Sequence, residues 1–158
     1  MNLLIDAHRQ LLEAMLHHNV DFIVIGGYAV IFHGYDRTTG DIDLWLKPDN
    51  ANKPRVIEAL RAYGIEDDSL NDVSTLDFTQ TIAFAIGAEP ERIDFITRIN
   101  LIDYNEADRD KTIAEVDGLR IPFLHLNHLI LSKINTNRLQ DKADVDMLQK
   151  IAQHSDNK

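Results

Sequence analysis

The stretch FIVIGGYAVIFHGYDRTTGDIDLWL, residues 22–46, decides the fold of this chain. Its first four residues, 22–25, are apolar and mostly β-branched, and they are too few for a helix, so they predict a buried strand. The run breaks at Gly26-Gly27, where a short helix over residues 28–33 is expected to begin. A polar loop then leads to residues 41–46, which predict a second strand.

Two acidic residues, Asp41 and Asp43, alternate with apolar residues on this second strand. Side chains two residues apart on a strand project from the same face, so the two carboxylates are expected to lie together. Ile42 and Leu44 would then face the core. Because two like charges held this close repel each other unless a cation lies between them, the pattern predicts a divalent metal.

The composition excludes several classes of protein. The chain has 158 residues, which suits one domain, 1–158, with a core over about 20–123 and a helical segment over about 124–158. There is no cysteine, so we expect a reducing, cytoplasmic setting and no thiolate zinc site. No apolar run approaches the roughly 20 residues that a membrane span needs. The net charge of −10 argues against a broad DNA-binding surface, because such a surface must neutralise phosphates.

The rest of the chain mixes helical and strand patterns, which predicts an α/β (α+β) protein with a mixed, twisted sheet flanked by helices and C-terminal helices. Asn52 could cap one of the helices, and the acidic stretch 65–77 lacks periodicity, so we expect a surface loop there. The expected helices are 3–18, 53–63, 104–110, 126–134 and 141–152, and the further expected strands are 81–86, 92–96, 113–116 and 119–123.

A third carboxylate stands inside one of these strands. Asp94 lies between Ile93 and Phe95, and an aspartate in an otherwise buried strand is costly unless it is paired or binds a metal. If its strand neighbours Asp41 and Asp43, the three carboxylates would be about 5 Å apart.

These motifs resemble the DNA polymerase beta-like nucleotidyltransferase superfamily. The resemblance covers the apolar strand, Gly26-Gly27, thirteen intervening residues, Asp41-Ile42-Asp43-Leu44 and the later Ile93-Asp94-Phe95. The ending, with Lys133, residues 137–141, Asp144 and Leu148, is similar to that of small bacterial nucleotidyltransferase-fold proteins, including members of toxin–antitoxin pairs. One departure is Gln140, which stands where that ending usually has a lysine.

The resemblance implies a nucleotidyltransferase fold and the transfer of a nucleoside monophosphate from a nucleoside triphosphate, such as ATP, to an acceptor hydroxyl. Two Mg²⁺ ions, which Mn²⁺ could replace, would stabilise the attacking and leaving oxygens. Asp41 and Asp43 would bind both ions, and Asp94 would bind the catalytic ion and help to deprotonate or orient the acceptor. The residues expected to bind nucleotide and phosphate are Gly26, Gly27, Arg37, Thr38, Thr39, Lys133 and Arg138.

Simpler interpretations compete with several of these roles. Arg37 could be a solvated loop charge, and Lys133 and Arg138 could pair with Asp141 and Asp144 across the last two helices. Asp144 and Asp146 form a second Asp-x-Asp, but residues two apart on a helix point about 200° apart and cannot share a metal. His33 more simply packs or hydrogen-bonds, and His125 with His128 could form half of a zinc site only if a third ligand were near.

Two functions remain open. One is an active Mg²⁺-dependent nucleotidyltransferase whose acceptor is a small molecule, a protein or an RNA end, with a homodimer as one way to complete the acceptor site. The other is a nucleotidyltransferase-fold interaction protein that binds a cognate toxin or antitoxin and has little or no activity. The three costly carboxylates favour the enzyme, and the small size of the chain favours the interaction protein.

Overall fold

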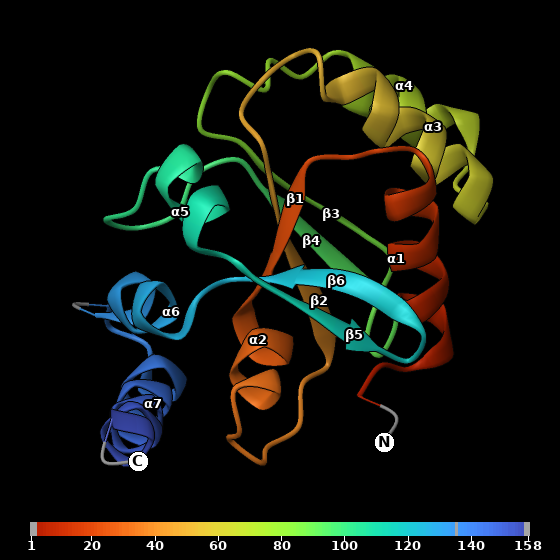
Figure 1. The fold of residues 1–158 in the computed structure, drawn as a ribbon. Helices are drawn as coiled ribbons and strands as arrows, with labels where there is room; N and C mark the ends of the chain where they lie inside the picture. The colour runs from red at the N-terminus through yellow and green to blue at the C-terminus, as the bar shows by residue number, and fades with distance from the viewer. Residues whose placement is uncertain (1–2, 135, 157–158) are drawn as a thin grey trace.

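The computed structural model describes residues 3–134 and 136–156. Within these residues a six-stranded mixed sheet runs through the centre of the molecule in the order β3-β4-β2-β1-β6-β5 (Figure 1). Its strands are β1 Phe22–Ile25, β2 Asp41–Leu46, β3 Ala83–Ile86, β4 Arg92–Ile96, β5 Thr112–Val116 and β6 Leu119–Phe123.

Helices flank this sheet in two groups, with α1, α3 and α4 together on one side and α5, α6 and α7 on the other (Figure 1). The short α2 lies at the end of β1. The helices are α1 Asp6–His17, α2 Gly26–Phe32, α3 Lys53–Tyr63, α4 Asp67–Ser74, α5 Tyr104–Asp110, α6 Leu126–Lys133 and α7 Leu139–Asp156. The predicted fold class, a mixed sheet flanked by helices and ending in C-terminal helices, is confirmed.

The strand pairing decides which residues meet at the centre of the sheet. β2 is antiparallel to β1 and parallel to β4, although 45 residues (47–91) separate β2 from β4 in the sequence. In this register Asp43 lies opposite Asp94 on one side and opposite Ile25 on the other. The parallel pairing therefore brings two distant acidic segments onto adjacent strands.

The alternation along β2 separates the core from the polar face. Ile42 and Leu44 are fully buried, whereas Asp41 and Asp43 remain partly accessible. Phe95 on β4 is buried beside them, so the neighbouring strands β2 and β4 present apolar side chains to one face and carboxylates to the other.

The prediction of a surface loop over residues 65–77 is wrong, because α4 occupies Asp67–Ser74. Leu70 and Val73, three residues apart, share one helical face and are buried against the core. Asp67 and Asp68 occupy the first turn, where the positive end of the helix dipole stabilises them. In the sequence, the many acidic residues of the exposed face obscured the short apolar stripe formed by Leu70 and Val73.

The predicted capping role of Asn52 is also wrong. Asn52 precedes α3, but its side chain makes no capping hydrogen bond to that helix. Instead its amide joins α3 to the start of β1: Oδ1 accepts from the Asp21 backbone N–H at 2.9 Å, and Nδ2 donates to the Asp21 carbonyl at 2.9 Å. The other expected elements lie where the sequence placed them, within a few residues at their ends. Across the described residues, no helix combines the length and the apolar character that crossing a membrane requires.

Candidate active site

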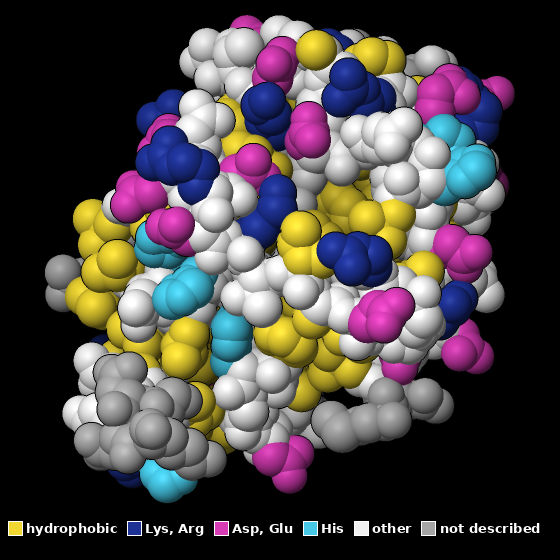
Figure 2. All heavy atoms as spheres, viewed as in Figure 1, with side chains coloured by type: hydrophobic (Ala, Val, Ile, Leu, Met, Phe, Trp, Pro, Cys, Tyr) yellow, Lys and Arg dark blue, Asp and Glu magenta, His cyan; other side chains and the backbone are white. Residues whose placement is uncertain are grey.

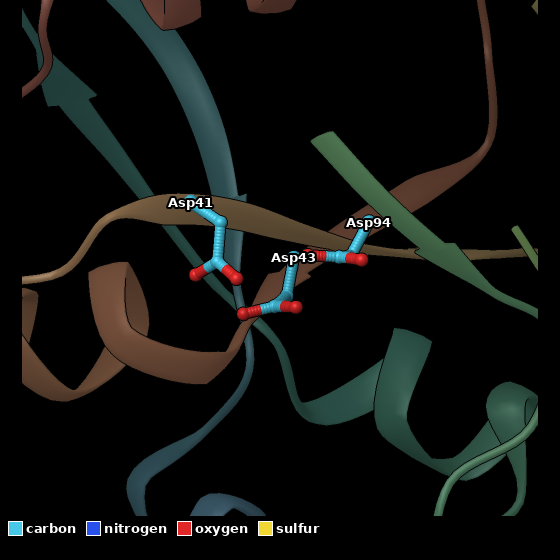
Figure 3. Close-up of side chains that lie close together, drawn as sticks. All are labelled: Asp41, Asp43 and Asp94. Carbon is cyan, nitrogen blue, oxygen red and sulfur yellow. The ribbon is translucent and has the colours of Figure 1, made fainter. Parts of the chain in front are cut away.

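Asp41 and Asp43 of β2 and Asp94 of β4, here called the acidic triad, point toward one another from the same face of the sheet (Figure 3). One carboxylate oxygen of each residue lies within 4.8 Å of the other two. Within the described part of the chain, this is the one group of three or more acidic, histidine or cysteine side chains close enough to hold a metal ion. The expected geometry of the three aspartates is therefore present.

The acidic triad is electrostatically unfavourable as it stands. Burial raises the pKa of Asp43 to about 7, and repulsion by Asp41 and Asp94 adds to this effect. Burial and the neighbouring Asp94 likewise raise the pKa of Asp41. Burial and mutual repulsion both disfavour the charged carboxylates, and a bound Mg²⁺ or Mn²⁺, which prefers hard oxygen ligands, would relieve both.

Arg92 is a site residue that the sequence reasoning missed. It lies two residues before Asp94 on β4, and its Nη2 and Nε donate to Asp94 Oδ1 at 2.9 and 3.1 Å. The signal was available, because residues two apart on a strand share a face. Arg92 thus partly neutralises the third carboxylate, and it does so beside Asp41, which it faces in the register of β2 and β4.

Gly26 makes room for the acidic triad. Its backbone adopts φ +66°, a left-handed conformation that favours glycine. A Cβ at this position would also collide with the side chain of Asp43, lying 2.8 Å from its Cγ and 2.9 Å from its Cβ. The sequence suggested that Gly26 lets phosphate approach, and the structure adds that the glycine is needed to seat Asp43.

Gly27 has a different neighbourhood, formed by the loop before β2. A Cβ on Gly27 would lie 2.5 Å from Thr39 Oγ1 and 3.3 Å from Arg37 Nη2. Thr39 Oγ1 in turn donates to the Asp41 carbonyl at 3.1 Å. Gly27 therefore allows a hydroxyl and a guanidinium to pack directly on the backbone beside the acidic triad.

The basic end of the site consists of Arg37, Lys133 and Arg138. Lys133 Nζ lies 3.1 Å from Asp141 Oδ1 and 3.0 Å from Asp144 Oδ2, so the predicted pairing across the last two helices is present for Lys133. Arg37 is also paired, because its Nη2 donates to Asp144 Oδ2 at 3.1 Å. The positive charges of Lys133 and Arg138 favour ionisation of Asp43.

A cleft of about 730 Å³ joins these parts. Its walls include all ten residues predicted for the site: Gly26, Gly27, Arg37, Thr38, Thr39, Asp41, Asp43, Asp94, Lys133 and Arg138. Beyond Asp94 the lining becomes small and apolar, with Ala83 and Ala85 of β3 and Ile96 of β4. These three residues form an apolar shelf on the β3 side of the cleft, where Glu89 and Arg92 also belong to the lining, and the basic residues Arg37, Lys133 and Arg138 occupy the β1 side.

The remaining candidates have structural roles. His33 Nε2 lies 2.7 Å from the Leu124 carbonyl, in agreement with the hydrogen-bonding interpretation. His125 caps α6 by accepting from the Asn127 N–H at 3.1 Å. Asp144 is fully buried whereas Asp146 is exposed, so the second Asp-x-Asp diverges as helical geometry requires.

The charge pattern of the visible surface agrees with the composition. Figure 2 shows Lys and Arg side chains scattered among Asp and Glu on this face of the molecule, without gathering into one basic area. A nucleic-acid-binding surface needs a concentration of positive charge, and this face does not supply one.

The comparisons with known proteins agree with this geometry. A family model described as "Nucleotidyltransferase of unknown function (DUF6036)" matches residues 3–156. Among curated proteins, no match is found.

Two solved structures share the fold. One is the lincosamide antibiotic adenylyltransferase LnuA bound to lincomycin, with a TM-score of 0.55, 16% identity, and 96% of this chain and 99% of that chain covered. The other is a Thermotoga maritima protein described as a nucleotidyltransferase, with a TM-score of 0.56, 13% identity, and 93% and 91% of the two chains covered. At such low identities the likeness establishes the fold alone.

Proposed function

The chain belongs to this family of nucleotidyltransferases, and from that premise we propose that it transfers a nucleoside monophosphate from a nucleoside triphosphate to an acceptor hydroxyl in a metal-dependent reaction. The observation that carries the proposal is the acidic triad, because three converging carboxylates are costly unless a cation is bound. A binding module has no need to maintain that arrangement.

The acidic triad fits a pair of Mg²⁺ or Mn²⁺ ions. Asp41 and Asp43 would hold both ions and Asp94 one, and the triphosphate oxygens would supply further ligands. When bound, the ions supply positive charge to the oxygens on either side of the reacting phosphorus. Asp94 is the member beside the apolar shelf, where it can orient the acceptor hydroxyl and take its proton.

The cleft suggests how the substrates are placed. Arg37, Lys133 and Arg138 gather on the β1 side, which suits the triphosphate. Nucleotidyl transfer joins the acceptor oxygen to the α-phosphorus while the bond to pyrophosphate breaks, with the two oxygens in line. The acceptor then approaches from the opposite side, over Ala83, Ala85 and Ile96. We propose a neutral hydroxyl compound or a protein side chain as acceptor, since neither requires a basic surface.

The proposal is tested first by nucleotide binding. Calorimetry with ATP, GTP, CTP and UTP in the presence of Mg²⁺ should give binding heat for at least one nucleotide. Binding should be lost when both Asp41 and Asp43 are changed to Ala. Asp146→Asn, which removes a charge from the exposed face of α7, serves as the control and should bind normally.

Transfer is tested by incubating labelled triphosphates with cell extract and the purified protein. Label on one metabolite, protein or RNA, dependent on Asp41, would identify the acceptor. If no triphosphate binds, the proposed activity fails, and a nucleotidyltransferase-fold partner of a toxin or antitoxin becomes the better description.

A further inference from the structure

Asp144 is a buried carboxylate that the reaction outlined above does not use. It lies on α7 and its side chain has no solvent exposure. Its two oxygens face four nitrogen atoms from three segments of the chain. Arg37 contributes Nη2 and Nε, both at 3.1 Å; Lys133 contributes Nζ at 3.0 Å; Gln140 contributes Nε2 at 2.8 Å.

This arrangement joins distant parts of the sequence. Arg37 comes from the loop before β2, Lys133 from the last turn of α6, and Gln140 from the first turn of α7. A second carboxylate, Asp141, also pairs with Lys133 and accepts a hydrogen bond from Thr136 at 2.8 Å. A fully buried aspartate is tolerated only when its charge is matched, and here two cations and an amide match it.

The same two cations line the cleft beside the acidic triad. The side chains of Arg37 and Lys133 are 17% and 10% exposed, so each is largely buried while still lining the cleft. Arg37 Nη2 packs against Gly27, and the charge of Lys133 reaches Asp43. Asp144 therefore fixes the positions of both groups relative to the reacting centre.

We propose that Asp144 is a positioning residue for the triphosphate: it holds Arg37 and Lys133 as a preorganised pair on the β1 side of the cleft. This inference rests on the proposed nucleotidyl transfer. Arginine and lysine side chains lose much rotational freedom when they bind a ligand, and that loss is smaller when a buried carboxylate already orders them. Asp144 itself stays behind the two cations and does not contact the nucleotide.

A purely structural role predicts something different. If Asp144 only fastened α7 to the protein, its loss would lower thermal stability, yet the folded fraction would bind phosphate normally. A positioning role predicts weaker phosphate binding by protein that is shown to be folded. Phosphate affinity measured on folded protein therefore separates the two roles.

The experiment compares the wild type with Asp144→Asn and with the control Asp146→Asn, which removes the same charge from the exposed face of the same helix. Inorganic tripolyphosphate and ATP are titrated in the presence of Mg²⁺ by calorimetry, after circular dichroism confirms folding. We expect Asp144→Asn to weaken both ligands about tenfold, and Asp146→Asn to change them less than about twofold. In a transfer assay the change should appear in KM for the nucleotide more than in kcat.

Equal affinities in wild type and Asp144→Asn would overturn the inference while leaving nucleotidyl transfer intact. Absence of nucleotide binding by the wild type would instead overturn the proposed function. If Asp144→Asn does not fold, Gln140→Ala removes one partner and keeps both cations. Tripolyphosphate should then bind about two- to threefold more weakly, and unchanged binding by Gln140→Ala would equally overturn the inference.

Discussion

The acidic triad and the basic end lie in one cleft but are held by opposite means. In the acidic triad the backbone of two parallel strands forces like charges together, and burial raises the pKa of Asp43 to about 7. At the basic end, Arg37 from a loop and Lys133 from a helix are held by buried counter-charges, above all Asp144. The first arrangement is strained until a cation binds, whereas the second is already satisfied, so the two ends should respond differently to substitution.

The largest effect is expected for Asp41→Asn. Removing one carboxylate deprives both bound ions of a ligand, so nucleotidyl transfer should fall about a thousandfold or more. The same change relieves repulsion, so the metal-free protein should be as stable as the wild type or more stable. Transfer rates and urea unfolding, measured on one preparation, test both halves of the prediction. Lower stability in the metal-free state would show that the acidic triad is not strained.

Gly26→Ala should come next, with a loss of transfer of about a hundredfold, because the new methyl group displaces Asp43. The left-handed backbone adds a loss of about 1 kcal/mol in the free energy of unfolding. Gly64→Ala is the matched control, since Gly64 also has a positive φ, +113°, but a Cβ there would meet no atom within 4 Å. Both variants should lose stability, and only Gly26→Ala should lose activity. Equal transfer activities in Gly26→Ala and Gly64→Ala would mean that Asp43 tolerates the displacement.

A pH titration of the metal-free protein sharpens the comparison further. Asp43 keeps its proton up to about pH 7 in the folded state, whereas an unfolded aspartate releases it near pH 4. Between these values the folded state binds more protons, so the free energy of unfolding should decrease as pH rises. With solvent in the cleft screening part of the shift, the decrease should be about 2 kcal/mol. Urea unfolding in EDTA from pH 5 to pH 8 measures it. Asp43→Asn should make the dependence clearly smaller, with Asp41 supplying the remainder, and an equal slope in that variant would contradict the assignment.

The two ends also differ in how far the sequence predicts them. Asp41 and Asp43 can be predicted from local sequence, since strand periodicity alone places them on one face. Asp94 can be recognised because a charged residue is unusual in an otherwise apolar strand. Their meeting depends on the parallel pairing of β2 with β4, which local patterns do not encode but the resemblance supplied. The sequence offered Asp144 as a partner of Lys133 or Arg138, but its contact with Arg37 could not be predicted, because Arg37 lies 107 residues away and was equally consistent with a solvated loop charge.

The missed helix α4 shows the same limit. Local composition around Leu70 and Val73 reads as an acidic loop, and only the tertiary contact of those two side chains makes it a helix. Periodicity within one element therefore accounts for most of the correct predictions, and contacts between distant segments account for most of the failures, with Arg92 as the exception because its place beside Asp94 on β4 was open to the same periodicity argument.

The smallest effect is expected at Arg92, a basic residue that pairs with one member of the acidic triad. Arg92 pairs with Asp94 as the basic end pairs with Asp144, but this pair is partly exposed, with side-chain exposures of 46% and 26%. A metal ion bound by Asp94 must compete with the guanidinium for the carboxylate oxygens. Arg92→Gln should therefore tighten Mn²⁺ binding by about two- to fivefold, a small change because water already screens the pair.

Calorimetric titration with Mn²⁺ at low and high salt measures this effect, and the gain should shrink as salt weakens the pair in the wild type. Arg98→Gln, on the loop that follows β4, removes the same charge from outside the cleft lining and provides the control. Weaker Mn²⁺ binding by Arg92→Gln would mean that the guanidinium orients Asp94 for the metal. In that case the acidic triad, like the basic end, would depend on a counter-charge to fix its geometry.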